Sequence, residues 1–196
     1  MNTQITTENE THQPQVIPTT IRRIVLAGFM GAGKTTIGRL LAERLGWTFA
    51  DLDHLIEAHA GKTVPQVFAE DGEEKFRRLE STVLARALSS TNTVLALGGG
   101  APESLTNRLL LEQTPGTLVV FLSAPFPVLF DRCMLEELNP QIPGQTRPVL
   151  ADPVAAEKRF ATRQPHYRRL AKITLDTTEF DQAAAVNSLV EKIASL

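Results

Sequence analysis

The chain has 196 residues, of which 42% are hydrophobic and 21% charged, with a formal net charge of −2 and a pI near 6.1. These values are typical of one globular domain with a substantial core, and they exclude a broadly basic surface for nucleic acid. No apolar stretch reaches the ~18 residues that a membrane-spanning helix needs.

The first twenty residues are polar and contain neither the apolar segment of a signal peptide nor the arginines of a transit peptide. We expect residues 1–20 to be a disordered tail and residues 21–196 to form one domain. Cys133 is the only cysteine, which excludes an internal disulfide and fits a reducing compartment. We therefore expect a cytoplasmic protein that binds neither nucleic acid nor a membrane.

The stretch from residue 23 to residue 45 carries the most specific signal. The apolar run 23–27 predicts a strand buried on both faces of a parallel sheet. Residues 28–35 then fit G-x-x-x-x-G-K-[ST], and the apolar spacing after them predicts a helix over 34–45. In such a loop, backbone N–H groups and the helix N-terminus bind phosphates, Lys34 reaches the outer phosphates, and the Thr35 hydroxyl can bind Mg²⁺. The chain should bind ATP or GTP.

Two carboxylates follow the second expected strand, 48–50, as Asp51 and Asp53. Because the ends of parallel strands face the ligand crevice, one carboxylate can order the water shell of Mg²⁺ and the other can accept the proton of an attacking hydroxyl. Alternatively, Asp53 caps the helix expected over 53–60. The sequence leaves both interpretations open.

The next helices are expected over 64–70 and 74–89, and Thr63 and Gln66 form a capping box at the start of the first. Arg77 and Glu80 lie off the apolar stripe of the second helix and close enough to pair. They form either a solvated charged face or half of a carboxylate or phosphate site. A second arginine would come from the group Arg159, Arg163, Arg168 and Arg169, of which the last two should lie on the surface.

The strand expected over 93–97 ends in the triplet Gly98, Gly99 and Gly100, which either lets a ligand approach the backbone or forms a simple turn. Further strands are expected over 117–122 and 172–175, and further helices over 103–112, 125–134, 153–169 and 180–195. Alternating strands and helices predict an α/β fold with a parallel sheet. Residues 135–149 hold three prolines and interrupt the pattern, which suggests a mobile lid that delivers Arg147.

Together these motifs resemble the shikimate kinase family over the chain from about residue 22 to its end. The P-loop, Asp51-x-Asp53, the stretch from Gly72 to Arg77, the glycine triplet, Arg147-Pro148 and the stretch from Arg163 to Arg168 occur in the family's order. The resemblance implies a three-layer P-loop kinase fold with strand order 2-3-1-4-5, a substrate-binding segment near 53–89 and a lid near 134–151. It implies transfer of the γ-phosphate of ATP to the 3-hydroxyl of shikimate, and it favours a monomer.

The resemblance also implies residue roles. Lys34, Asp53 and Arg147 would be catalytic, and Asp53, Arg77, Arg163 and the glycines 98, 99 and 100 would bind shikimate. Thr35 and Asp51 would hold Mg²⁺, the latter through water. The residues implied to contact ATP are Gly31, Ala32, Gly33, Lys34, Thr35, Thr36, Arg132 and Arg147.

The chain departs from the family pattern in the lid, where Asn139 to Gly144 looks like an insertion. Three functional alternatives stay open at this point. Another small carboxylated polyol could replace shikimate, as in a gluconate kinase; a nucleotide kinase would need more phosphate-binding arginines than the sequence offers. A regulatory nucleotide-binding module without catalysis would be expected to lack at least one of the catalytic residues, and all are present.

Overall fold

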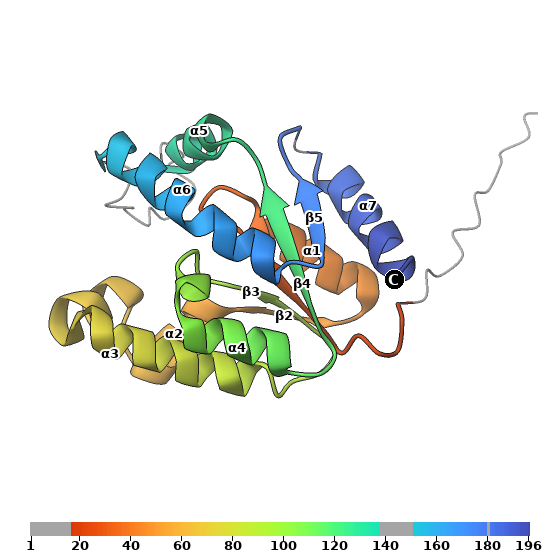
Figure 1. Ribbon diagram of the computed structural model, residues 1–196, viewed down its shortest axis with the longest axis horizontal. Coiled ribbons are helices and arrows are strands. Elements are labelled where there is room, and N and C mark those ends of the chain that lie inside the picture. Colours follow the sequence, from red (N-terminus) through yellow and green to blue (C-terminus); the bar gives the residue numbers. More distant parts are fainter. Residues whose placement is uncertain (1–16, 138–150, 180) are drawn as a thin grey trace, which may run out of the picture.

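Figure 1 shows a computed structural model of the chain, which describes residues 17–137, 151–179 and 181–196. In this part of the chain the strands form one parallel sheet in the order β2-β3-β1-β4-β5, as the resemblance implied. The strands are β1 (Arg23–Ala27), β2 (Thr48–Asp51), β3 (Thr93–Ala96), β4 (Thr117–Ser123) and β5 (Ile173–Asp176).

Helices cover both faces of the sheet, so the domain has three layers (Figure 1). Helices α1 and α7 pack against each other on one face, whereas α4 and α6 contact β4 on the other. Helix α3 packs on α2 and α4 beside this second group. The helices are α1 (Lys34–Leu45), α2 (Leu52–Ala60), α3 (Val64–Ala87), α4 (Leu105–Gln113), α5 (Phe126–Glu137), α6 (Pro153–Leu170) and α7 (Gln182–Ala194), with a 3-10 turn η1 at Ala101–Glu103.

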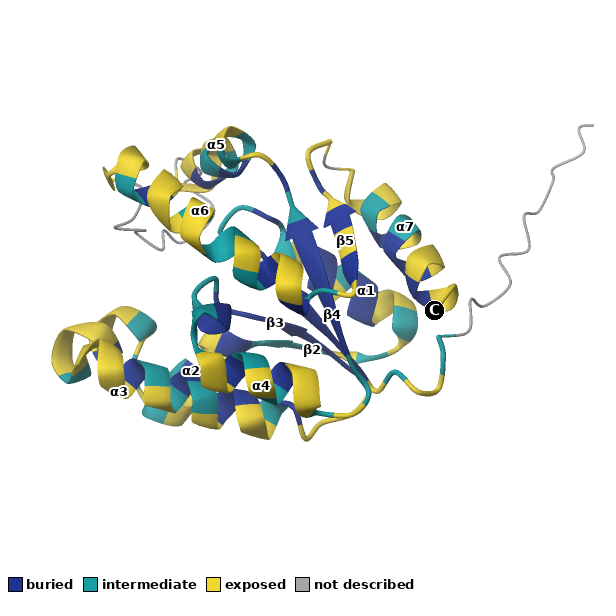
Figure 2. Ribbon diagram, viewed as in Figure 1, coloured by how far each residue is buried: buried dark blue, intermediate teal, exposed yellow. Residues whose placement is uncertain are grey.

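The core lies on both faces of the central strands, as the continuous apolar runs predicted. Every residue of β1 and β3 is buried, and β4 is buried except at its two ends (Figure 2). The two edge strands are the exceptions: β2 has one exposed and three half-buried residues, and β5 alternates buried and exposed residues. A fully buried centre holds the carboxyl ends of β1 and β3 in place, and the loops that follow these strands build the site.

The helix boundaries agree closely with the sequence, and two details explain local geometry. The predicted break between 70 and 74 is a kink at Gly72, whose φ of 80° and ψ of 167° are not helical, inside the continuous α3. The capping box of Thr63 and Gln66 is present at its start. The residue that caps α2 is Asp51, which accepts from the backbone N–H of Asp53, so capping by Asp53 itself is wrong.

Several expected features fall outside the described residues, namely most of the tail, most of the lid and Arg147. Within the described residues, Ile21 donates a backbone hydrogen bond to Pro18 and Ile17 packs against the core, although both Ile17 and Pro18 fall in the range assigned to the tail. No helix among the described residues is both long and apolar enough to cross a membrane.

Candidate active site

The P-loop connects β1 to α1 with the backbone shape that its glycines permit. Gly31 and Gly33 have φ values of 73° and 86°, which residues with a side chain rarely adopt. Gly33 caps α1 without any side-chain hydrogen bond, so the N-terminus of a twelve-residue helix remains available to an anion. The Lys34 ammonium group donates to the carbonyl oxygens of Gly28 (3.0 Å) and Phe29 (2.9 Å) and thus stays folded over the loop.

The two residues expected to hold Mg²⁺ are in direct contact. The Thr35 hydroxyl donates to Asp51 Oδ2 at 3.1 Å, while Asp51 Oδ1 accepts from the backbone of Asp53. These are oxygen donors, the type that Mg²⁺ prefers, and a partial protein ligand set suits an ion that also binds phosphates and water. The described residues contain no group of three or more histidine, cysteine or acidic side chains that could hold a metal without such help.

Asp53 lies at the start of α2 and faces the glycine triplet after β3. A Cβ atom on Gly98 would stand 2.7 Å from Asp53 Oδ1, so the carboxylate reaches the backbone only because residue 98 has no side chain. Asp53 keeps contact with solvent, yet the surrounding protein removes part of its hydration. This desolvation, with the nearby charge of Asp51, raises the pKa of Asp53 above its usual value, and Lys34 opposes the rise. A carboxylate with a raised pKa is a better proton acceptor.

Arg77 projects from α3 and is held by a buried carboxylate. Its guanidinium group pairs with Glu80 at 3.1 Å, and Glu80 is 1% exposed. Glu80 also accepts from the fully buried Asn107 of α4 at 3.3 Å, which ties α3 to α4 below the site. Burial raises the pKa of Glu80, and the positive charge of Arg77 partly offsets that rise. The predicted pairing of Arg77 with Glu80 is confirmed.

Arg163 approaches Arg77 from α6, and the two share a carboxylate. Glu103 Oε2 lies 3.0 Å from the Nη2 atom of Arg163 and 3.7 Å from that of Arg77. The Arg163 side chain is 14% exposed, and its buried Nε has no hydrogen-bond partner among the described residues. Its guanidinium group also lies over the Phe29 ring, 6.0 Å from the centroid. The structure therefore brings together the two arginines that the sequence suggested as a carboxylate site.

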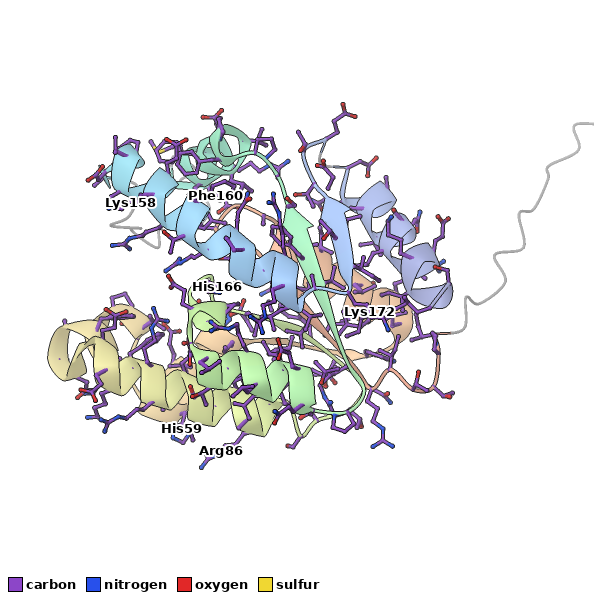
Figure 3. The ribbon with its side chains drawn as sticks, in the orientation of Figure 1. His59, Arg86, Lys158, Phe160, His166 and Lys172 are labelled. Atoms are coloured by element: carbon purple, nitrogen blue, oxygen red, sulfur yellow. The ribbon has the colours of Figure 1, made fainter. Side chains whose placement is uncertain are left out.

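An aromatic cluster positions this part of α6. Phe160 contacts Phe29 after β1 and Phe126 at the start of α5, with ring centroids 5.4 and 5.6 Å apart, and Figure 3 labels Phe160 on α6 beside α5. Three residues further along α6, Arg163 emerges toward the glycine triplet. Arg168 and Arg169 are exposed, as expected, and so is Arg159. Only one member of the arginine group therefore reaches the site.

The glycine triplet is the floor of the site. The fully buried Tyr167 donates its hydroxyl proton to the carbonyl oxygen of Gly99, which couples α6 to this loop. A Cβ on Gly100 would meet Arg77 Nη1, Arg77 Nη2 and Glu103 Oε2, each at 3.0 Å. Because none of the three glycines has the positive φ that favours glycine, close approach of side chains explains Gly98 and Gly100. A Cβ on Gly99 would have its nearest contact at 3.5 Å, which is an ordinary distance.

Arg132 of α5 lies at the opposite end of the P-loop. Its guanidinium group donates to the carbonyl oxygen of Gly31 at 3.5 Å and to those of Thr177 and Thr178 after β5. The resemblance implied that Arg132 contacts ATP, and the structure places it between the P-loop and the loop after β5. Of the histidines in the described ranges, His59 pairs with Arg86 on the outer side of α2 and α3, and His166 lies on α6 (Figure 3).

Sequence reasoning missed three contributors, Glu103, Asn107 and Tyr167. None belongs to a motif with its own chemistry, and each acts through a partner distant in sequence. Tyr167 was noted only as part of the stretch from Arg163 to Arg168. Its position four residues after Arg163, on the same helical face, was the available signal.

Comparison with known proteins gives a consistent result. The family model described as shikimate kinase matches residues 30–194. A shikimate kinase of Symbiobacterium thermophilum is 42% identical over 173 residues, which cover 87% of this chain and 95% of the relative. The solved structure of a shikimate kinase from Acinetobacter baumannii in complex with shikimate is 35% identical in sequence and has a TM-score of 0.78. The match covers 90% of this chain and 94% of the Acinetobacter chain. A gluconokinase from Sinorhizobium meliloti shares the fold at 19% identity, with a TM-score of 0.56 over 90% of this chain and 93% of its own.

Proposed function

The chain belongs to the shikimate kinase family, and we propose which of its residues perform that family's reaction, transfer of the γ-phosphoryl group of ATP to the 3-hydroxyl of shikimate. The observation that carries the proposal is the carboxylate shared by Arg77 and Arg163 above the glycine triplet. An acidic acceptor needs such a pair, and Asp53 stands beside the same triplet. The arginine pair, the proposed base Asp53 and the start of the P-loop thus all lie beside the glycine triplet.

ATP binds at the P-loop in this proposal. The backbone N–H groups of residues 31–36 (Gly31, Ala32, Gly33, Lys34, Thr35, Thr36) surround the β- and γ-phosphates, where the N-terminus of α1 adds positive potential. Lys34 leaves the carbonyl oxygens of Gly28 and Phe29 for the phosphate oxygens, which are stronger acceptors. Arg132 borders the base site from α5.

Shikimate binds across the crevice from the P-loop. Arg77 and Arg163 hold its carboxylate through charge-assisted hydrogen bonds, and the buried Nε of Arg163 is one donor that still lacks a partner in the described structure. The backbone of Gly98, Gly99 and Gly100 supports the ring, because the absence of side chains leaves space there. Tyr167 stabilises that backbone through Gly99.

During transfer, the oxygen of the 3-hydroxyl group bonds to the γ-phosphorus, and the Asp53 carboxylate accepts the proton that this hydroxyl group loses. The bond between this phosphorus and the β–γ bridging oxygen breaks, and ADP leaves with the electron pair. Lys34 and Arg147 neutralise the charge on the transferred group; Arg147 lies outside the described residues, and its role rests on the family resemblance. The contribution of the protein is mainly orientation and electrostatic stabilisation.

Thr35 and Asp51 would hold Mg²⁺, Thr35 directly and Asp51 through water, since their 3.1 Å contact already places both oxygens at the phosphate end of the site. When bound, the ion supplies charge neutralisation at the phosphate oxygens. We also infer a monomer from the family resemblance and a cytoplasmic location from the single cysteine; size-exclusion chromatography with light scattering tests the first.

A coupled assay of ADP release with Mg·ATP tests the function. Shikimate is compared with quinate, gluconate and AMP as acceptors. Release that depends on shikimate supports the assignment of acceptor and carboxylate site together. Release with gluconate but not shikimate would contradict the acceptor and keep the kinase, whereas tight ATP binding without release for any acceptor would contradict the catalytic roles.

A further inference from the structure

We propose that Glu103 is a resident counter-ion of the arginine pair, which the carboxylate of the substrate must displace to bind. Glu103 thereby weakens the binding of the acid. The inference rests on the proposed function, because it takes Arg77 and Arg163 as the carboxylate site. It adds a residue to which no motif of the sequence assigned a role.

The geometry of Glu103 is that of a bound carboxylate. One oxygen, Oε2, lies within 3.0 Å of Arg163 Nη2 and 3.7 Å of Arg77 Nη2, so a single atom serves both guanidinium groups. The same oxygen stands 3.0 Å from the Cβ position of Gly100. This is the space above the glycine triplet where the proposed function places the acid group of the substrate.

The backbone of Glu103 is fixed, whereas its side chain can move. The N–H of Glu103 donates to Gly100 O at 2.9 Å, and Arg108 Nη1 donates to Glu103 O at 2.8 Å. The side chain itself is 32% exposed, so water can reach the carboxylate on one side. Displacement therefore requires a rotation of one side chain into solvent and no change in η1 or α4.

The charges around the pair make displacement necessary. Arg77 and Arg163 carry two positive charges, and three carboxylates already pair with them: Glu80, Glu103, and Glu73, which lies 3.3 Å from Arg77 Nη2. Glu80 cannot leave, because it is 1% exposed. Glu73 is 69% exposed and pairs with Arg77 on its outer side. A further carboxylate in contact with both arginines would add to the negative charge of a partly dehydrated site, which is unfavourable. Glu103 is the carboxylate that occupies the place shared by the two arginines and can leave it.

The exchange is balanced in charge only for an acid. An incoming carboxylate restores the charge balance that the departure of Glu103 removes. A neutral hydroxyl group restores no charge, and its hydrogen bonds to guanidinium are weaker than those of a carboxylate. Moving Glu103 costs the same free energy for either ligand, and the displaced carboxylate stays close enough to repel the acid alone. Glu103 therefore lowers the affinity of the arginine pair for the acid.

Calorimetric titration of the full-length protein tests this inference with shikimate and with its methyl ester, which lacks the charge. Glu103→Gln should lower the Kd for shikimate about fivefold or more, since a charge-assisted contact is typically that strong after allowance for partial exposure. The gain for the ester should be no larger than that for the acid, because the ester carries no charge for Glu103 to repel. A loosened fold would not change the two ligands in this order.

Glu112→Gln is the matched control, because Glu112 of α4 also pairs with an arginine of α6, Arg169, at 3.9 Å, but on the surface. It should leave both Kd values unchanged. Arg163→Ala separates the inference from the proposed function, since it should weaken shikimate binding strongly. If Arg163→Ala weakens binding while Glu103→Gln leaves or raises the Kd, the counter-ion role is wrong and the carboxylate site stands.

If Arg163→Ala leaves the Kd for shikimate unchanged, the carboxylate site and the counter-ion role both fail. Thermal unfolding checks that each variant is folded, and Glu103→Ala replaces Glu103→Gln if the latter is not. Tighter shikimate binding in either folded variant, with a gain for the ester no larger than that for the acid, is the result that supports the inference.

Discussion

Gly98→Ala should reduce turnover and leave ATP binding intact, because the new methyl group collides with the proposed base. The Cβ position of residue 98 lies 2.7 Å from Asp53 Oδ1, and its three nearest heavy atoms all belong to this carboxylate. The backbone can accept alanine, since Gly98 does not have a positive φ of the kind that favours glycine. The whole effect therefore falls on the position of Asp53.

The size of the effect follows from that distance. Ordinary contact begins at 3.4 Å, so the carboxylate must retreat by about 0.7 Å from its 2.7 Å position. A misplacement of about 1 Å at a reacting group costs roughly a hundredfold in rate. We therefore expect kcat to fall by about tenfold to a hundredfold. The short side chain of Asp53, whose neighbour Asp51 bonds to its backbone N–H, has few ways to avoid the methyl group.

Alanine substitutions at all three glycines, measured by the coupled ADP assay with separate kcat and KM values, give the decisive comparison. Gly100→Ala should mainly raise the KM for shikimate, because its Cβ meets Arg77 and Glu103 at 3.0 Å. Gly99→Ala should have the smallest effect, as its nearest contact is 3.5 Å. If Gly98→Ala retained full turnover, or if Gly99→Ala were the most damaging, close approach would not explain the triplet.

Two further predictions concern the base and the phosphate loop. Asp53→Asn should cut turnover by about a hundredfold or more with near-normal ATP binding. Wild-type turnover should fall as the pH drops through the raised pKa of Asp53, because the base becomes protonated. Burial disfavours the ionised form of Asp53 in the folded state, so Asp53→Asn should raise the Tm slightly at pH 8, and this rise should disappear toward pH 4. A lower Tm of the variant at pH 8 would contradict the desolvation of Asp53. Gly31→Ala should weaken ATP binding at least about tenfold and lower the Tm, since its φ is 73° and its Cβ would collide with the Leu129 carbonyl oxygen. Gly46→Ala is the control, because Gly46 has a φ of 65° and its Cβ would meet no atom within 4 Å. It should lower the free energy of unfolding by only about 1 kcal/mol and leave ATP binding intact. Equal loss of ATP binding in the two variants would contradict the role of the Leu129 contact.

Much of the fold could be predicted because its signals are local. Buried parallel strands appear as continuous apolar runs, and each predicted strand agrees with an observed one to within one residue at each end. The kink at Gly72 and the capping box at Thr63 also depend on adjacent residues only. Strand order is not local, and it was obtained from the family resemblance rather than from the pattern of residues.

The site could be predicted only where a residue carries its own chemistry. Lys34, Thr35 and Asp51 follow from the P-loop and from the end of a strand, and their contacts agree with that interpretation. The role of Glu103 could not be found in this way, because it depends on α3 and α6 meeting above η1, 26 and 60 residues away in the sequence. Asp53 was open to two interpretations, and only the backbone geometry at Asp51 excluded the capping one.

The position of β1 in the sheet has a consequence for biosynthesis. β1 is made first but lies in the middle, where Arg23 pairs with Thr93 on one side and with Thr117 on the other. While the chain emerges from the ribosome, both edges of this apolar strand lack their partners until β3 and β4 have been synthesised. Pairings so distant in sequence form slowly and leave exposed edges that favour aggregation. A nascent chain that ends before β4 would therefore be expected to need protection by a chaperone, whereas a chain that ends after β4 could already close the centre of the sheet.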